Sequence, residues 1–416
     1  MDEIYIKGGR PLYGEITIQG SKNAALPMMA AALLHRGTSV LAGCPKIADV
    51  FCMEEILHCL GATTWWEGAD LYLDCRGVGK TSIPGRLTEK MRSSVILLGV
   101  LAARCGEGQM GYPGGCVIGK RPIDLHLMVL EKLGAVIEED GRMIRVQAKQ
   151  LTGSRIIFSK RSVGATEQGI LAAVTARGET VLKNCACEPE ITWLCKFLKT
   201  MGADIRGEGS DTITIYGKED LNAGNMRVPP DRIVTGTYIC AAAVTGGEIL
   251  IQNPPEGELN AFLEVYHKMG GQYKRKSGKL LVNGSCCKNS ISYLETAAYP
   301  GFPTDLQSQI MTVLTLASGE SHICEQIFED RFKVAEELNR MGANIKVSGR
   351  DACIYGTDTL RGTHVQAREL RGGAALVLAG LAAYGTTCIQ GYSYIKRGYE
   401  HICEDLSSLG AWIKQK

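Results

Sequence analysis

The chain has 416 residues, of which 45% are apolar and 22% charged, and its formal net charge is +2. This composition is typical of a globular protein of two or three domains, and it excludes the broad basic surface expected for nucleic-acid binding. No run of about 18 apolar residues could span a membrane, and "MDEIYIKGGR" does not resemble a secretory leader. We expect the 16 cysteines to be free and mostly buried thiols, without structural metal.

Six repeats of about 70 residues follow one another along the chain. Each contains a turn of the type "CLGATTW" or "KLGAVIE", in which a glycine follows a helical pattern and precedes an alternating strand pattern. A glycine there fits the left-handed position that follows a helix. The glycines lie 68 to 73 residues apart, at Gly61, Gly134, Gly202, Gly270, Gly342 and Gly410.

A second series of glycines has the same period. Each of them follows a run of small and apolar residues such as "LVLAGLAAYG", and this composition predicts helices that are buried on all sides. We expect these six helices to end at Gly37, Gly106, Gly178, Gly246, Gly319 and Gly385.

Each repeat therefore reads strand, helix, strand, helix, strand, which predicts an α/β fold with three repeats in each of two domains. The sixth turn is followed only by "AWIKQK", whereas an additional strand, "EIYIKGG", precedes the first repeat. We therefore predict that residues 1–19 and 230–416 form a discontinuous C-terminal domain and that residues 20–229 form the N-terminal domain.

Equivalent positions near the starts of the six buried helices carry charge in five of six repeats. They are Lys22, Arg92, Gly164, Asp231, Asp305 and Arg371. Helix capping is a sufficient explanation for the two aspartates. The helix dipole disfavours the three cations, so we interpret them as an anion-binding set. Gly164 either lets a ligand approach the backbone or simply forms a turn.

Further cations lie in predicted loops, where each is either a solvated charge or an anion ligand: Lys46, Lys160, Arg161, Arg331 and Arg397. One loop, "GYPGGCVIGKRPIDLH" (111–126), also carries Cys116. Lys120 and Arg121 would lower the pKa of that thiol, so Cys116 is either reactive or an inert structural residue. The chain contains no protease-type triad beside it, no GxGxxG at a strand–helix junction and no GxxxxGK[ST] motif.

Several motifs together resemble one enzyme family. "GSKNAALP", "GGCVIGKRPIDLH", "SVGAT", "PPDRIVTGT", "FPTDLQ", "FEDRF", "LRGGAALVLAG" and "RGYE" occur in the order found in the enolpyruvyl transferases that start bacterial peptidoglycan synthesis. The resemblance implies two inverse α/β prism domains with pseudo-threefold symmetry and an active site in the cleft between them. It implies transfer of the enolpyruvyl group of phosphoenolpyruvate to the 3′-hydroxyl of UDP-N-acetylglucosamine through a tetrahedral ketal, in the cytoplasm and without a metal or organic cofactor.

The resemblance also implies roles for individual residues. Cys116, on a mobile loop 111–121, corresponds to the general acid and to the target of fosfomycin, while Asp305 corresponds to the base on the sugar hydroxyl. The implied catalytic set is Cys116, Asp305, Lys22 and Arg397. The implied contacts to phosphoenolpyruvate are Lys22, Asn23, Arg92, Arg121, Arg331, Arg371 and Arg397. The implied contacts to UDP-N-acetylglucosamine are Asn23, Arg92, Arg121, Pro122, Ile123, Asp124, Leu125, Lys160, Ser162, Val163, Gly164, Asp305 and Ile327.

Two alternatives remain open at the level of sequence. The shikimate-pathway enolpyruvyl transferases share the six repeats, although the cysteine loop and "SVGAT" argue against that branch. A catalytically silent paralogue that only binds a sugar nucleotide is the second alternative, and the joint presence of Lys22, Cys116, Asp305 and Arg397 argues against it.

Overall fold

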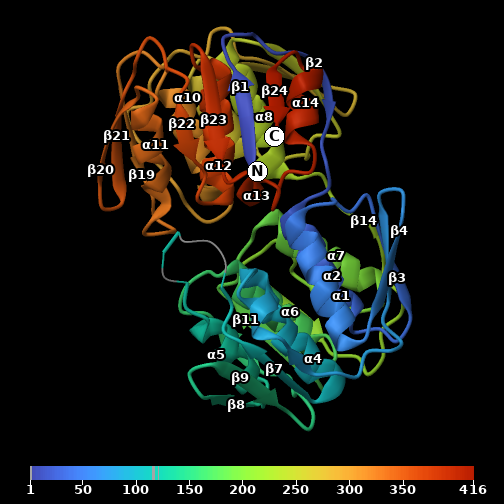
Figure 1. Cartoon of the computed structure of the whole chain (residues 1–416). Coiled ribbons are helices and arrows are strands. Elements are labelled where there is room, and N and C mark those ends of the chain that lie inside the picture. Colours follow the sequence, from blue (N-terminus) through green and yellow to red (C-terminus); the bar gives the residue numbers. More distant parts are fainter. Residues whose placement is uncertain (1, 115–117, 120) are drawn as a thin grey trace. The chain divides into compact units, whose positions relative to one another are not determined.

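A computed structural model describes residues 2–114, 118–119 and 121–416 of the chain (Figure 1). By their contacts these residues divide into two units. The N-terminal unit comprises residues 20–114 and 121–229, and the C-terminal unit comprises residues 2–19, 118–119 and 230–416. Within these ranges no helix is both long and apolar enough to cross a membrane.

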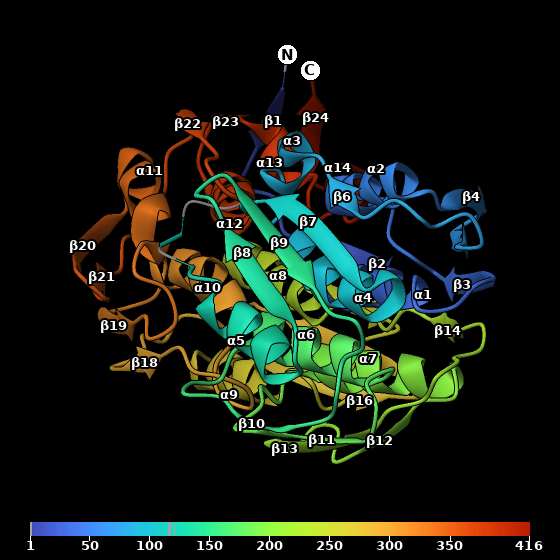
Figure 2. The same cartoon turned by 90° about the horizontal axis from the view of Figure 1, so that it is seen from below.

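The N-terminal unit contains three four-stranded sheets with one shared topology. The first two strands in each order are parallel and the other neighbours are antiparallel. The sheet of β7, β8 and β9 can be followed in Figure 2. The orders are β14 (Asn225–Arg227), β3 (Thr38–Ala42), β5 (Asp70–Asp74), β4 (Thr63–Glu67); β6 (Ser82–Ile83), β7 (Glu107–Gly111), β9 (Met143–Gln147), β8 (Val136–Glu139); and β10 (Arg155–Ile157), β11 (Glu179–Lys183), β13 (Thr212–Tyr216), β12 (Asp204–Arg206).

The C-terminal unit repeats the same topology three times. The first strand of the chain, β1, pairs antiparallel with both β23 and β24 and so completes the sheet of the sixth repeat. The two chain ends therefore lie side by side (Figure 1). The orders are β22 (His364–Gln366), β23 (Thr386–Gln390), β1 (Glu3–Lys7), β24 (Trp412–Gln415); β2 (Tyr13–Thr17), β15 (Glu248–Gln252), β17 (Lys279–Asn283), β16 (Gln272–Lys276); and β18 (Leu294–Glu295), β19 (Glu320–Cys324), β21 (Asp351–Tyr355), β20 (Asn344–Ser348).

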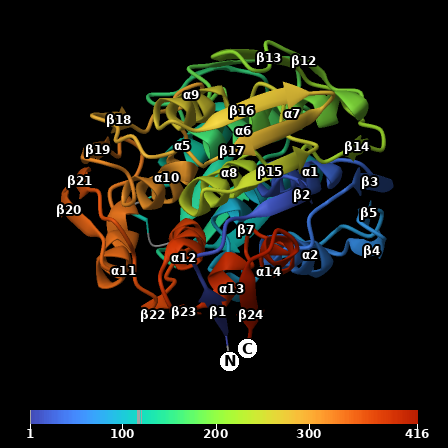
Figure 3. The same cartoon turned by 90° about the horizontal axis from the view of Figure 1, so that it is seen from above.

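Buried helices lie at the centre of each unit. In the C-terminal unit α8, α10 and α12 contact one another among the three sheets (Figure 3), and α12 buries every residue except Ala382. The central helices are α1 (Lys22–Ala32), η1 (Arg92–Ile96) with α4 (Leu97–Cys105), α6 (Val163–Ala173), α8 (Arg232–Thr245), η2 (Thr304–Leu306) with α10 (Gln307–Leu314), and α12 (Leu370–Ala382). The other helices are α2 (Ala48–Leu60), α3 (Gly85–Thr88), α5 (Asp124–Lys132), α7 (Pro189–Thr200), α9 (Asn260–Lys268), η3 (Arg331–Lys333), α11 (Val334–Arg340), α13 (Tyr392–Ile395) and α14 (Ile402–Ser408).

Each unit therefore consists of three copies of one repeat, in which sheets surround buried helices. Strand residues alternate between buried and partly exposed positions, as in β5, where Leu71 and Leu73 are buried and Tyr72 is not. This architecture is the inverse α/β prism with three repeats in each domain, and that prediction from sequence is confirmed.

The glycines of the "LGA" turns adopt the predicted conformation. Their φ angles lie between 93° and 102° in all six repeats. This left-handed region is strained for residues that carry a Cβ, so the recurrence of glycine there has a backbone cause.

The prediction that the six buried helices end at the second series of glycines is wrong in four of the six repeats. Gly106 and Gly246 do cap α4 and α8, but the other helices end three to five residues before the glycine. At the end of α1, the backbone N–H groups of residues 33, 34 and 35 each donate to the carbonyl three residues earlier. This tighter turn satisfies carbonyls at the helix end, and the glycine instead precedes the next strand. The four helices concerned are α1, α6, α10 and α12.

The 15 cysteines that the structure describes are all free, and nine of them are buried. Cys286 is the exposed one among them. In the same part of the chain there is no group of three or more side chains that could hold a metal ion.

Candidate functional site

The start of α1 brings a cation and a carboxylate together. Ser21 caps this helix, and its hydroxyl accepts a hydrogen bond from the backbone N–H of Ala24 at 3.4 Å. Lys22 is the first helical residue, and its Nζ lies 3.4 Å from Oδ2 of Asp49 in the first turn of α2. Asn23, the next predicted site residue, is half-buried. Asp49 thus offsets part of the unfavourable interaction between Lys22 and the helix dipole.

A buried carboxyl group that the sequence analysis missed lies in the same region. Glu167 is on α6 and is 7% exposed. Burial raises its pKa to about 8; Glu190 and Glu188 act in the same direction, and Lys22 opposes them. Glu167 is therefore neutral at pH 7. Its carboxyl group, the one ionisable side chain in the predicted buried helix "SVGATEQGILAA", was the available signal.

Arg92 and Arg121 form a second group of cations in the N-terminal unit. Arg92 is the first residue of η1, and its Nη2 donates to the carbonyl of Pro122 at 2.9 Å. Burial, together with the smaller effect of the positive charge of Arg121, lowers the pKa of Arg92 to about 10. Arg92 therefore still carries its charge at pH 7, and two neighbouring guanidinium groups favour the binding of an anion.

Gly164 has a structural role that neither sequence interpretation included. A Cβ atom at this position would lie 2.6 Å from Nε2 of His126, a 6% exposed residue on α5. Burial, with the charges of Arg92 and Arg121, lowers the pKa of His126 to about 3, so the imidazole is neutral. Its Nδ1 has no hydrogen-bond partner among the described residues. Gly164 thus makes room for a neutral histidine beside two arginines.

The other predicted nucleotide contacts lie around the starts of α5 and α6. Ile123 and Leu125 are buried, whereas Pro122, Asp124 and Lys160 are exposed. Ser162 caps α6 by accepting a hydrogen bond from the backbone N–H of Ala165 at 3.4 Å, and Val163 is the first residue of that helix.

Asp305 lies in the C-terminal unit, between two arginines. Its Oδ1 accepts a hydrogen bond from Nη2 of Arg331 at 2.7 Å, and its Oδ2 accepts one from Nη2 of Arg371 at 2.9 Å. Both arginine side chains are at least 95% buried, whereas the aspartate side chain is 28% exposed. Burial alone would lower the pKa of Arg371, but Asp305, Tyr399 and Asp231 together raise it above its ordinary value. The capping explanation is therefore wrong for Asp305, which lies within η2 without capping it.

Capping is correct for Asp231. It is the N-cap of α8, and its Oδ1 accepts hydrogen bonds from the backbone N–H groups of Ile233 and Val234 at 2.8 and 3.0 Å. Glu369 has the equivalent position on α12, where it accepts from the backbone N–H groups of Arg371 and Gly372.

The remaining predicted residues of this unit lie in turns. Ile327 is 37% exposed, and its backbone N–H donates to the carboxylate of Glu325 at 2.8 Å. Arg397 is half-buried and lies just after α13. Lys46, in the other unit, lies 5.2 Å from the ring centroid of Trp66 in a cation–π contact, which favours a structural role for it. Cys116 and Lys120 lie outside the described residues.

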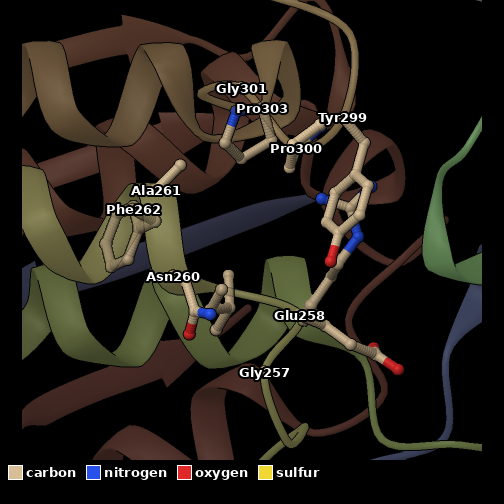
Figure 4. Close-up of a pocket in the computed structure, with 11 residues that line it drawn as sticks. Gly257, Glu258, Asn260, Ala261, Phe262, Tyr299, Pro300, Gly301 and Pro303 are labelled. Atoms are coloured by element: carbon tan, nitrogen blue, oxygen red, sulfur yellow. The ribbon is translucent and has the colours of Figure 1, made fainter.

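A small cavity lies next to the segment that carries Asp305. Its volume is about 50 Å³, enough for a few water molecules and too small for a sugar nucleotide. In Figure 4, Phe262 and Tyr299 lie on opposite sides of this cavity, and Pro303 belongs to its lining. A second hollow, lined by the carboxylates of Glu329, Asp330 and Glu336 among others, is unsuited to anionic substrates.

Comparison with known proteins identifies the family. The model of the family "EPSP synthase (3-phosphoshikimate 1-carboxyvinyltransferase)" matches residues 6–406. The chain is 45% identical to UDP-N-acetylglucosamine 1-carboxyvinyltransferase 2 of Caldanaerobacter subterraneus subsp. tengcongensis, over 99% of both chains. It is 44% identical to UDP-N-acetylglucosamine 1-carboxyvinyltransferase of Koribacter versatilis, over 100% of this chain and 96% of the relative.

Solved structures of enolpyruvyl transferases share the fold over the whole chain. The enolpyruvyl transferase NikO from Streptomyces tendae has a TM-score of 0.89 at 25% identity and covers 100% of this chain and 98% of its own. EPSP synthase from Acinetobacter baumannii, at 19% identity and full coverage of both chains, has a TM-score of 0.75 and supports the fold alone. The chain belongs to the enolpyruvyl transferase family, and within it to the UDP-N-acetylglucosamine 1-carboxyvinyltransferases.

Proposed function

We propose that this protein transfers the enolpyruvyl group of phosphoenolpyruvate to the 3′-hydroxyl of UDP-N-acetylglucosamine and releases phosphate. The observation that carries the proposal is the 45% identity, over 99% of both chains, to a transferase named for this reaction. The charged starts of the buried helices support it, because both substrates are anions and helix N-termini with cations favour anions.

The reaction consists of an addition followed by an elimination. In the addition, a proton from Cys116 goes to C3 of phosphoenolpyruvate, the 3′-oxygen bonds to C2, and Asp305 takes the hydroxyl proton. In the elimination, the new methyl group returns a proton to the Cys116 thiolate, the double bond between C2 and C3 re-forms, and the bond from C2 to the phosphate oxygen breaks. The phosphate leaves with the proton that Asp305 had taken from the hydroxyl. Lys22, Arg92, Arg121 and Arg397 stabilise the phosphate and the developing negative charge. That residues of both units act in one cleft stays a prediction.

The contacts of Asp305 favour a base that is held in a fixed direction. Two arginine hydrogen bonds, one to each carboxylate oxygen, hold the carboxylate in one orientation. The two cations also stabilise the ionised form that a base requires. We also propose that the reaction takes place in the cytoplasm.

The direct test is phosphate release from phosphoenolpyruvate, with and without UDP-N-acetylglucosamine. We expect release only when the nucleotide is present, and none with shikimate 3-phosphate in its place. Cys116→Ser should lose at least about 100-fold in turnover, because general acid catalysis contributes 10²–10⁴-fold. Cys286→Ser, which changes an exposed thiol, is the matched control.

Each outcome has a defined meaning. Wild-type protein that releases no phosphate above background would refute the proposed transfer. Full turnover by Cys116→Ser would refute the role of the thiol alone. We also expect fosfomycin to add its mass covalently to wild-type protein and to Cys286→Ser, but not to Cys116→Ser.

A further inference from the structure

A buried carboxylate, Glu325, connects three segments of the C-terminal unit. It follows β19 directly and is 0% exposed. Four donors reach its two oxygens. Oε1 accepts from the hydroxyl of Thr296 at 2.8 Å and from the backbone N–H groups of Ile327 and Phe328 at 2.8 and 3.1 Å, and Oε2 accepts from the hydroxyl of Thr304 at 2.9 Å.

Two of the three connected segments carry predicted site residues or lead into them. Thr304 is the first residue of η2 and directly precedes Asp305. Ile327 lies in the turn that Glu325 closes, and Arg331 begins η3 four residues later. Since Arg331 also donates to Asp305, the hydrogen bonds of Glu325 and Asp305 close a ring through both segments.

Further bonds hold the carboxylate itself in place. The hydroxyl of Thr296 accepts from the backbone N–H of Gln326 at 3.0 Å, so its own proton is directed at Glu325. The backbone carbonyl of Glu325 accepts from Nη1 of Arg350 at 3.0 Å, and its N–H donates to the carbonyl of Arg350 at 2.8 Å. A buried polar network in which every member has a partner fixes geometry strongly.

We propose that Glu325 is a positioning residue of the transferase: it orients Asp305 through Thr304 and sets the turn that presents the backbone of Ile327 to the nucleotide. The inference rests on the proposed function. Because none of its four donors is a substrate group, Glu325 acts on the reaction only through these neighbours. An error of about 1 Å in the position of a reacting group can lower turnover about 100-fold, so loss of the hydrogen bonds of Glu325 should have a measurable effect on turnover.

Two substitutions separate the connections. Glu325→Gln replaces one acceptor by an NH₂ group that faces donors, and we expect about a 10- to 100-fold loss of kcat/KM, with a higher KM for UDP-N-acetylglucosamine. Thr304→Val disconnects only η2, so kcat should fall while that KM stays within about twofold. Thr304→Ser retains the hydroxyl and should recover most of the lost turnover.

Glu54→Gln is the matched control. Glu54 is also buried, and it accepts from the hydroxyl of Thr64 at 2.7 Å and from Nε1 of Trp66 at 3.1 Å, both on β4 and outside the segments that carry Asp305 and Ile327. We expect it to lower thermal stability as Glu325→Gln does and to keep kcat and KM. An equal kinetic effect of both variants, or equal kcat for Thr304→Val and Thr304→Ser, would overturn the positioning role.

Amide hydrogen exchange tests the same inference without the reaction. Glu325→Gln should speed exchange at residues 304–306 and 327–328, and Glu54→Gln should not. Unchanged exchange in those segments would overturn the inference even in a protein with full activity. Absence of phosphate release by wild-type protein would instead overturn the proposed function, so the two failures are distinguishable.

Discussion

Replacing Glu167 by glutamine should change the pH dependence of stability. The folded protein holds this carboxyl group at a pKa of about 8, whereas the reference value is 4.5. Between these two values the folded state therefore binds more protons than the unfolded state, and its stability falls as the pH rises. The shift of about 3.5 units corresponds to about 5 kcal/mol, of which about 3 kcal/mol is already lost at pH 7.

Glutamine resembles the neutral carboxylic acid in shape and does not ionise, so Glu167→Gln removes this loss. The variant should match wild type near pH 4.5, exceed it by about 3 kcal/mol at pH 7 and by about 5 kcal/mol above pH 8. Urea unfolding at pH 5, 7 and 8.5 measures the difference. Glu131→Gln, which changes an exposed carboxylate on α5, is the control and should show no such trend. A difference for Glu167→Gln that stays constant across this pH range would refute the neutral, buried carboxyl group.

Two further substitutions test individual parts of the N-terminal unit. Gly164→Ala should destabilise the protein by about 1–3 kcal/mol in urea unfolding, because the added Cβ would lie 2.6 Å from His126. Adding His126→Ala should recover much of that loss, and additive effects of the two substitutions would contradict the steric explanation. Lys22→Ala should weaken phosphoenolpyruvate binding far more than nucleotide binding in a calorimetric titration, and equal losses would contradict the assigned position of the lysine.

The repeat architecture could be predicted because its signals are local. A glycine with positive φ after a helix, and a helix of small residues that is buried on all sides, each leave a pattern within one repeat. The helix ends could not be placed from the second glycine series. Whether a chain leaves a helix through a tight turn or through a left-handed residue depends on hydrogen bonds that composition does not encode.

The sequence was sufficient to locate the cations of the candidate site, but it predicted only some of the contacts that these side chains make. The periodicity located Lys22, Arg92 and Arg371, because cations at helix starts contradict the local electrostatic preference. It did not reveal the ion pairs of Asp305, since Arg331 comes from a different segment. Glu325 left no signal either, because a single carboxylate after a strand shows its four donors only in the folded chain.

The three cations at helix starts differ in how the fold balances them, and the difference indicates where an anion has to bind. Lys22 has Asp49 within 3.4 Å, and Arg371 has Asp305 within 2.9 Å. Within the described residues Arg92 forms no ion pair; it donates to a backbone carbonyl and has the charge of Arg121 nearby. Two positive charges at a partly buried position favour the binding of an anion. Both proposed substrates are anions, so we expect the surroundings of Arg92 to be the part of the N-terminal unit that contacts one of them.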